Sequence, residues 1–378
     1  KWVLASSDRN GLRPLRYTVT SDDLFFAGSE SGMIKIPEER IIEKGKLGPG
    51  QIIAIDLKKG KLFKDKEIKD FLAKDYRKYN KQIIELDKKI SNENEKPSFI
   101  KDDLRKRQYL SGLSIEDLEL ILHPMAEEGK EASGSMGDDT PVAVLSSHYR
   151  PVSHYFRQNF SQVTNPPIDS LRENKVMSLK TRFGNLGNIL DFDNLTEENI
   201  YVLDSPILTN SQFKKFKKFF SKKVKVIDCT FDIKSSLKDR IENIREETET
   251  AVREGSTFII LSDKNISDQK ASIPSILTVG AVHSYLVKQG LRGYCSLNVE
   301  CSDALDTHSF AVLIGVGATT VNPYLAIDSI YQRFEKKLFG ESDFQGCVNR
   351  FKKSIDAGLL KIMSKMGISV ISSYRGGC

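Results

Sequence analysis

Residues 123–141 read HPMAEEGKEASGSMGDDTP, and this stretch decides our prediction of the fold. One apolar segment, Leu118–Leu122, precedes it and another, Val142–Leu145, follows it. We expect a helix or strand to end at the first segment, a long loop to follow, and a new strand to begin at the second. Three glycines, two serines and two adjacent aspartates would let the backbone of this loop approach a ligand closely. On composition alone, an ordinary surface loop explains the stretch equally well.

The composition is that of an ordinary globular protein. The 378 residues exceed what a single core usually holds, about 250–300 residues, so two or more cores are expected. Hydrophobic residues make up 39% of the chain and charged residues 29%, which are typical values. The net charge of +6 is mild and the lysines lie among acids, which argues against nucleic acid as a partner. The sequence contains no run of about 20 apolar residues, so we expect no membrane span.

The cysteines and histidines show no arrangement typical of a metal site. The five cysteines are odd in number and scattered, which favours reduced thiols in a cytoplasm-like compartment. Cys295 and Cys301 would share one face of a strand, and an iron–sulfur cluster needs at least a third thiolate nearby. The histidines lack the spacing of common zinc motifs. The chain opens at Lys1 and ends at Cys378, both beside segments typical of a domain interior, so we expect a longer polypeptide.

The first third of the chain changes character near residue 65. Short apolar runs bounded by turn residues, Trp2–Ala5, Leu24–Ala27 and Ile52–Ile55, indicate a β-rich piece over residues 1–60. Residues 65–107 are rich in lysine and acids and favour helix. We interpret those charges as a solvated helix face or a linker.

From about Leu113 to Met366, strand-like and helix-like segments alternate. The expected strands are Val142–Leu145, Val224–Ile227, Phe258–Leu261, Ser296–Val299 and Ala311–Ile314, and the expected helices include Ile276–Gln289 and Leu325–Phe339. Apolar strands separated by helices predict an α/β domain, with a mostly parallel sheet and helices on both faces. Residues 315–324 would then form a turn from strand to helix, where α/β proteins often bind ligands. A tight turn with Asn322 capping the next helix fits equally well.

A second motif lies near the N-terminus. Asn10-Gly11 within the segment Asp8–Tyr17 is typical of a turn between two strands, so we expect a hairpin. Together with Gly28–Gly32, this segment resembles the late part of an N-terminal-nucleophile (class II) glutamine amidotransferase domain. In that family an N-terminal cysteine attacks the glutamine amide. Our sequence has no cysteine before Cys229, so the nucleophile is not part of it.

Four motifs resemble the large subunit of glutamate synthase: the opening stretch, QVTNPPID (162–169), LSDKNISDQKASIPSIL (261–277) and KIMSKMGIS (361–369). The resemblance runs almost end to end and implies four parts. Residues 1–64 would end the amidotransferase domain and supply the small β-rich segment, and residues 65–112 would form a charged helical connection. Residues 113–351 would be the central domain, and residues 352–378 would begin the FMN-binding synthase domain.

The resemblance also implies a function. Glutamate synthases convert glutamine and 2-oxoglutarate into glutamate, with ammonia crossing an internal tunnel and reduced FMN supplying electrons. The whole enzyme would hold FMN and a 3Fe-4S cluster, whereas we expect the present segment alone to bind neither. Its partners would be the other domains of the same polypeptide, with a small NADPH-oxidising subunit or ferredoxin. The compartment would be the cytoplasm, or a plastid for the ferredoxin-dependent type.

On this interpretation the segment joins two catalytic domains and is inactive alone. Two alternatives stay open: a stand-alone α/β module that binds a phosphate-bearing ligand at the turn of residues 315–322, and a purely structural scaffold. We predict no catalytic residue and no metal ligand. The residues that we expect near the flavin are Met136, Gly137, Asp138, Asp139, Thr140, Ser372, Tyr374 and Arg375. Arg375 would suit a phosphate because its guanidinium offers a fixed fork of donors.

Overall fold

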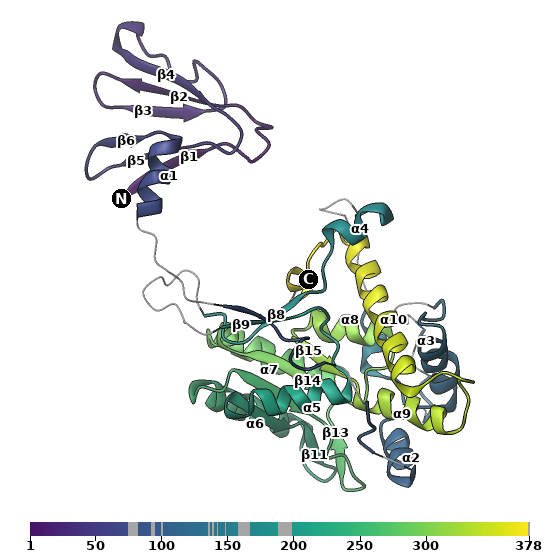
Figure 1. Cartoon of the computed structure of the whole chain (residues 1–378). Helices are drawn as coiled ribbons and strands as arrows, with labels where there is room; N and C mark the ends of the chain where they lie inside the picture. The colour runs from purple at the N-terminus through teal and green to yellow at the C-terminus, as the bar shows by residue number, and fades with distance from the viewer. Residues whose placement is uncertain are drawn as a thin grey trace. The chain divides into compact units, whose positions relative to one another are not determined.

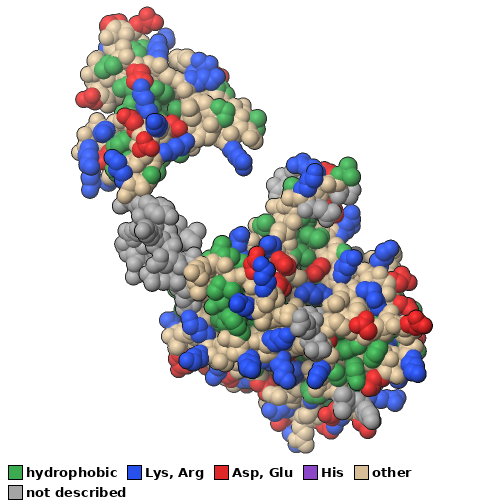
Figure 2. All heavy atoms as spheres, in the orientation of Figure 1, with side chains coloured by type: hydrophobic (Ala, Val, Ile, Leu, Met, Phe, Trp, Pro, Cys, Tyr) green, Lys and Arg blue, Asp and Glu red, His purple; other side chains and the backbone are tan. Residues whose placement is uncertain are grey.

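The computed structural model forms two compact units, Lys1–Asn80 and Lys81–Cys378 (Figure 1). It describes the whole chain except residues 75–81, 92–94, 100, 135–136, 138–139, 142, 148, 158–166, 188–198 and 377–378. Each unit has a hydrophobic core of its own. Lysine, arginine and acidic side chains lie interspersed on the visible face of each (Figure 2). In the described residues, no helix combines the length and apolarity that crossing a membrane would require.

The first unit consists of two antiparallel three-stranded sheets, in the orders β1-β5-β6 and β3-β2-β4. Its elements are β1 (Trp2–Ser6), β2 (Leu15–Thr20), β3 (Phe25–Gly28), η1 (Glu38–Arg40), β4 (Ile41–Leu47), β5 (Ile52–Asp56), β6 (Lys61–Phe63) and α1 (Asp65–Lys74). The three apolar runs that predicted strands correspond to β1, β3 and β5. A small core of Ala54, Phe63 and Ile68 holds α1 against the first sheet, and the Trp2 ring packs 5.4 Å from that of Phe63.

The expected hairpin at Asn10-Gly11 is wrong, because β1 and β2 belong to different sheets. The segment is instead a folded connection built around Asp8. The Asp8 carboxylate accepts hydrogen bonds from the backbone N–H groups of Asn10 and Leu12. Gly11 adopts a left-handed φ of 62°, and both Gly11 and Gly50 donate to the Asp8 carbonyl oxygen. The turn signal was correct, but a turn does not require that its flanking strands pair with each other.

The second unit is built on a parallel sheet of four strands in the order β10-β12-β14-β15. The strands are β10 (Val224–Asp228), β12 (Phe258–Ser262), β14 (Ser296–Glu300) and β15 (Thr320–Asn322). Successive residues of β12 point to opposite faces of the sheet, and each face has its own core. The predicted α/β architecture, a parallel sheet with helices on both faces, is confirmed.

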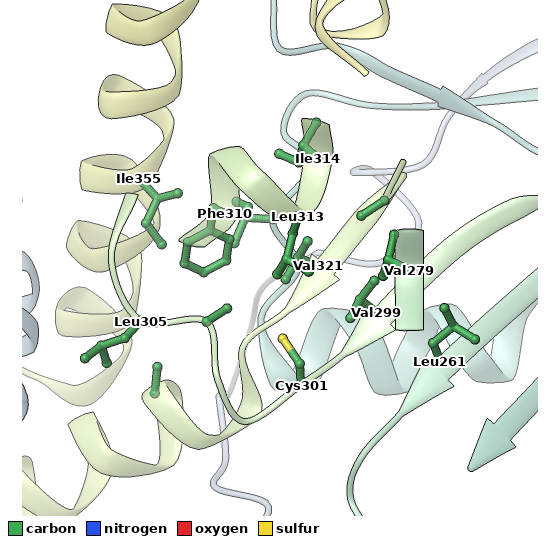
Figure 3. Close-up of a cluster of buried hydrophobic side chains, with 14 of the residues drawn as sticks. Leu261, Val279, Val299, Cys301, Leu305, Phe310, Leu313, Ile314, Val321 and Ile355 are labelled. Carbon is green, nitrogen blue, oxygen red and sulfur yellow. The ribbon is translucent and has the colours of Figure 1, made fainter. Parts of the chain in front are cut away.

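One face of β12, with Phe258 and Ile260, packs on α5 (Asn210–Phe219). A small mixed sheet covers the same face and consists of β7 (Ile83–Glu85), β9 (Ile200–Leu203) and β8 (Thr181–Phe183). The other face, with Ile259 and Leu261, packs on α6 (Leu237–Arg253) and α7 (Ser275–Lys288). Figure 3 shows part of this second core, in which side chains from β14, β15 and α7 meet those of the helices beyond them.

The remaining elements surround this framework. They are α2 (Lys101–Leu110), the π-helical η2 (Asp117–Leu122), α3 (His123–Glu127), η3 (Val152–Tyr155), α4 (Ser170–Val176), η4 (Ser221–Lys223), β11 (Thr230–Asp232), β13 (Lys270–Ser272), η5 (Arg292–Tyr294), α8 (Thr307–Gly315), α9 (Tyr324–Glu335), α10 (Phe344–Lys365) and α11 (Ile371–Tyr374). Helix α10 runs without interruption through residue 352, where the synthase domain was expected to begin. Within the expected charged connection, residues 83–85 form β7, and Leu86 and Ile90 are fully buried.

Two of the predicted strands are wrong. Ala311–Ile314 lies within α8, whose Asp306 cap accepts a hydrogen bond from the Ser309 N–H at 2.9 Å. The turn after α8 therefore leads from a helix into β15. This turn lies at the amino ends of the parallel strands, whereas ligands usually bind at their carboxyl ends. The described residues of Val142–Leu145 form a turn, and the Val144 and Leu145 side chains are almost fully exposed.

Candidate functional site

The first part of the opening motif is helical and anchors the loop that follows it. Met125 and Ala126 of α3 are completely buried. The Ala126 carbonyl oxygen accepts a hydrogen bond of 2.8 Å from Arg350 Nε on α10. On the other side of α3, the His123 ring stacks on Phe339, with 4.8 Å between the ring centres. The loop thus begins at a fixed position beside α10.

A second anchor lies a few residues further along. One Glu131 carboxylate oxygen accepts the backbone N–H of Thr307 at 3.0 Å, at the start of α8. Burial raises the pKa of Glu131, although the hydrogen bonds from Thr307 favour its charged form. A carboxylate at a helix N-terminus meets unpaired N–H groups and the positive end of the helix dipole. The loop is therefore held against α8, the helix that follows β14.

Only part of the predicted loop site lies within the described residues. Met136, Asp138 and Asp139 are outside them. Gly137 has a left-handed φ of 78°, and a Cβ atom there would lie 2.5 Å from the Phe156 carbonyl oxygen. The Thr140 carbonyl oxygen accepts a hydrogen bond of 2.9 Å from the Arg150 side chain. A glycine is thus required at position 137 by the close approach of the segment around Phe156 as well as by its backbone conformation.

The C-terminal group of predicted residues lies against the turn after α8. The N–H of Gly376 donates to the Gly315 carbonyl oxygen at 2.8 Å, and Arg375 Nε donates to that of Ala318 at 2.9 Å. Ser372 is exposed, whereas Tyr374 and Arg375 are partly buried. The described contacts of the two predicted groups are therefore to different parts of the unit, the segment 150–157 for the loop and residues 315–318 for the C-terminal turn.

Around Arg375 the structure brings together two guanidinium groups and one imidazole from three separate segments: Arg375 itself, Arg292 in η5 and His283 in α7. Arg292 is held in place by four acceptors: His283 Nδ1 at 3.1 Å, the Cys295 carbonyl oxygen at 2.7 Å, the Gly317 carbonyl oxygen at 2.8 Å and Thr319 Oγ1 at 3.3 Å. We call Arg292, Arg375 and His283 the arginine cluster. In the described part of the chain, no carboxylate forms an ion pair with either of its arginines.

Burial and mutual repulsion alter the protonation of the cluster. Burial lowers the pKa of His283 to about 4, with further lowering by Arg292 and Arg375, so the imidazole is neutral near pH 7. Since its Nδ1 accepts a hydrogen bond from Arg292, the proton is on Nε2. Burial and Arg292 lower the pKa of Arg375 to about 10. Arg375 Nη2 is buried without a hydrogen-bond partner in the described residues. An unpaired donor within uncompensated positive charge fits an anionic group.

Cys295 and Cys301 do not fit an iron–sulfur cluster. Cys295 comes directly before β14 and Cys301 directly after it, and both are buried. Burial raises the pKa of Cys295 to about 11 and that of Cys301 well above its ordinary value, and this disfavours the thiolate that a cluster requires. No group of three potential metal ligands occurs among the residues that the structure describes.

Comparison with known families assigns both units. Residues 106–378 match the glutamate synthase central domain, and residues 1–81 match the class-II glutamine amidotransferases. The chain belongs to the glutamate synthase family. The central-domain match includes residues 352–378 and the whole arginine cluster. The sequence pointed to Arg375, but it missed Arg292 and His283, because no local pattern distinguishes them and only the fold brings them together.

The most similar relatives include glutamate synthases with different electron donors. The chain is 55% identical over 385 residues to "Glutamate synthase [NADPH] large chain" of Azospirillum brasilense, and 39% identical over 386 residues to that of Bacillus subtilis. It is 38% identical over 394 residues to a ferredoxin-dependent glutamate synthase of Synechocystis. These alignments cover 100% of the chain and 25% of each relative, so the chain spans about a quarter of their length.

Proposed function

We propose that this chain acts as the internal bridge of a glutamate synthase large chain. It would connect the glutamine amidotransferase domain to the flavin-dependent synthase domain and line part of the path of ammonia. The observation that carries this proposal is the order of two adjacent family matches, amidotransferase over residues 1–81 and central domain over residues 106–378, within one continuous alignment to the relatives. The whole enzyme would convert glutamine and 2-oxoglutarate into two molecules of glutamate.

The physical need for a bridge follows from the chemistry of ammonia. Ammonia released into water is protonated and diffuses away, and the ammonium ion is not a nucleophile. Two separated sites can share it only if the protein between them excludes water and keeps the domains in a fixed arrangement. The close-packed parallel sheet, with a core on each face, provides a rigid framework for this role.

We further propose that the arginine cluster faces the FMN site of the whole enzyme. Arg375, with Ser372 and Tyr374, would bind or stabilise the anionic part of the cofactor, and the loop Met136–Thr140 would approach the same domain junction. The unpaired Arg375 Nη2 and the absence of an acidic partner in the described residues support this proposal. When bound, reduced FMN supplies the electrons. Electron donors differ among the relatives, so the partner would be a small NADPH-oxidising subunit or ferredoxin.

The test uses the complete large chain with its electron donor. We expect glutamine- and 2-oxoglutarate-dependent oxidation of the donor, with two glutamates formed per turnover. A flavin-loaded enzyme that forms no glutamate would disprove the function.

For the cluster, Arg375→Gln should lower flavin content or glutamate formation while glutamine hydrolysis persists. Arg253→Gln serves as the matched control, because Arg253 is an exposed arginine in the last turn of α6, where it pairs with Glu249. Equal flavin content and equal coupling in Arg375→Gln and the control would show that Arg375 is only structural.

A further inference from the structure

A cavity of about 460 Å³ lies at the carboxyl ends of the parallel strands, whereas the arginine cluster lies at their amino ends. Glu300 and Asn322, the last residues of β14 and β15, form its floor. Lys264 follows β12, and the first turns of α5 form one wall. The carboxyl ends of parallel strands in an open α/β sheet are where such proteins usually bind ligands. The volume falls within the range of small-molecule sites, roughly 300–1,000 Å³.

The cavity is strongly basic. Its lining includes five lysines, Lys96, Lys214, Lys215, Lys217 and Lys264, and a single carboxylate, that of Glu300. Five positive charges and one negative charge leave a net charge of +4. Three of these lysines come from the acid-free stretch 213–225, and the fold adds Lys96 and Lys264 from two other segments of the chain. A concave site with one sign of charge and low-dielectric walls concentrates ions of the opposite sign.

The charges inside the cavity are only partly neutralised. The buried Glu300 carboxylate pairs with Lys217 at 2.8 Å and with Lys264 at 2.9 Å. Lys215 Nζ donates to the Ser91 carbonyl oxygen at 2.8 Å. Lys96 and Lys214 are exposed and form no ion pair with any described residue. Two cations thus share one anion, and two more lysines have no carboxylate partner among the residues that the structure describes.

The walls of the cavity are fixed before any ligand arrives. Asp328, which is fully buried, accepts the backbone N–H groups of Ser98 and Phe99 at 2.8 and 3.0 Å and the Asn210 side chain at 2.8 Å. The Asn322 amide donates to Asn210 Oδ1 at 3.0 Å. Side chains held in this way lose little conformational entropy on binding, so the cavity is preorganised.

We propose that this cavity binds a small anion with at least two negative charges, the chemistry that phosphate monoesters and dicarboxylates share. The unpaired lysines at its mouth would contact the anionic groups. Glu300, held at the floor by its two lysines and by Ser262, would accept a hydrogen bond from a hydroxyl or amino group of the ligand. The site is distinct from the arginine cluster and does not depend on the function proposed above.

Binding to the chain is measured by isothermal titration calorimetry at constant ionic strength. The probes are inorganic phosphate and pyrophosphate in one arm, 2-oxoglutarate and citrate in the other, and acetate as a monovalent reference. We expect saturable binding of at least one multivalent probe at a ratio of one per chain, with acetate much weaker. The arm that binds more tightly identifies the source of the charge.

A pair of variants assigns the binding to the cavity. The double variant Lys96→Ser/Lys214→Ser removes two exposed side chains and should fold normally, but it should weaken the affinity at least about tenfold. The double variant Lys234→Ser/Lys238→Ser changes the net charge equally at exposed positions elsewhere in the unit and should bind normally. Absence of saturable binding, or equal weakening in both double variants, would overturn the proposal.

Discussion

Replacing His283 should make the stability of the second unit less sensitive to acid. The pKa of this histidine is about 4 in the folded protein, against 6.5 for an ordinary histidine. In the unfolded chain His283 binds a proton below about pH 6.5, whereas in the folded protein its imidazole stays neutral down to about pH 4. The unfolded state therefore binds more protons between these values, so the free energy of unfolding rises with pH in this window. The stability that the neutral imidazole contributes is complete above pH 6.5 and is lost as the pH falls towards 4.

The expected magnitude follows from the same two pKa values. A difference of that size corresponds to roughly 3 kcal/mol when the pH falls below both values. The His283 side chain is only partly buried, so solvent screening reduces the expected effect to about 2 kcal/mol. Arg292 and Arg375 both disfavour the charged imidazole, which is why the effect should be larger than for an isolated buried histidine.

The measurement is urea unfolding at pH 7.5 and at pH 4.5, monitored by circular dichroism at the helical band. This signal reports mainly on the second unit, because α1 is the only α-helix described in the first. His283→Gln keeps an acceptor for Arg292 but cannot titrate, so its loss of stability on acidification should be about 2 kcal/mol smaller than that of the unchanged chain. His154→Gln, in η3, is the control. Equal acid sensitivity in the unchanged chain and in His283→Gln would refute the reasoning.

Three further predictions concern other parts of the chain. In the complete enzyme, Gly137→Val should disrupt coupling of the two half-reactions while glutamine hydrolysis partly survives; unchanged glutamine-dependent glutamate formation with normal flavin content would show that the loop is only structural. This chain alone should hydrolyse no glutamine, because its first cysteine, Cys229, is buried and burial raises its thiol pKa; ammonia release above the buffer level from purified chain would contradict this. Gly11→Ala should destabilise the first unit by about 1–2 kcal/mol, since its φ is 62° and its Cβ would lie 2.7 Å from Pro49 Cγ. Unfolding monitored by fluorescence of Trp2, the only tryptophan, reports this change, and an unaltered urea midpoint would argue against strain at this turn.

The sequence predicted those elements whose pattern of apolar and polar residues matches one type of secondary structure. β10, β12 and β14 were recognisable because each is a short apolar run between polar turns, and α7 because it is long. Helix α8 was mistaken for a strand because it is buried on nearly all sides and therefore shows no polar stripe. Because of this error, residues 315–319 were predicted to lie at the carboxyl end of a strand, whereas they precede β15. The Asp306 cap of α8 was the one local signal that would have corrected the assignment.

The candidate site was less predictable than the fold for a physical reason. Arg375 was accessible to sequence reasoning because a family motif lies beside it. Its neighbours Arg292 and His283 come from η5 and α7, and their proximity depends on the packing of α7 against β14. The basic cavity also depends on the fold, which brings Lys96 and Lys264 beside the lysine-rich start of α5. The lysine-rich stretch is visible in the sequence, but its two distant partners are not.

Helix α10 has a mechanical consequence for the second unit. Its 22 residues form a continuous rod, roughly 33 Å long at 1.5 Å per residue. Arg350 near its start holds the first part of the glycine-rich loop, and the Ser364 carbonyl oxygen near its end accepts a hydrogen bond from the backbone N–H of Ile168. Gly358 in its middle lies so close to α8 that a Cβ atom there would be 2.4 Å from Thr307 Cγ2. A straight helix resists compression far better than a loop does. The helix therefore fixes the distance between the start of the glycine-rich loop and the C-terminal turn. A displacement at one of its ends would shift the whole helix along its axis.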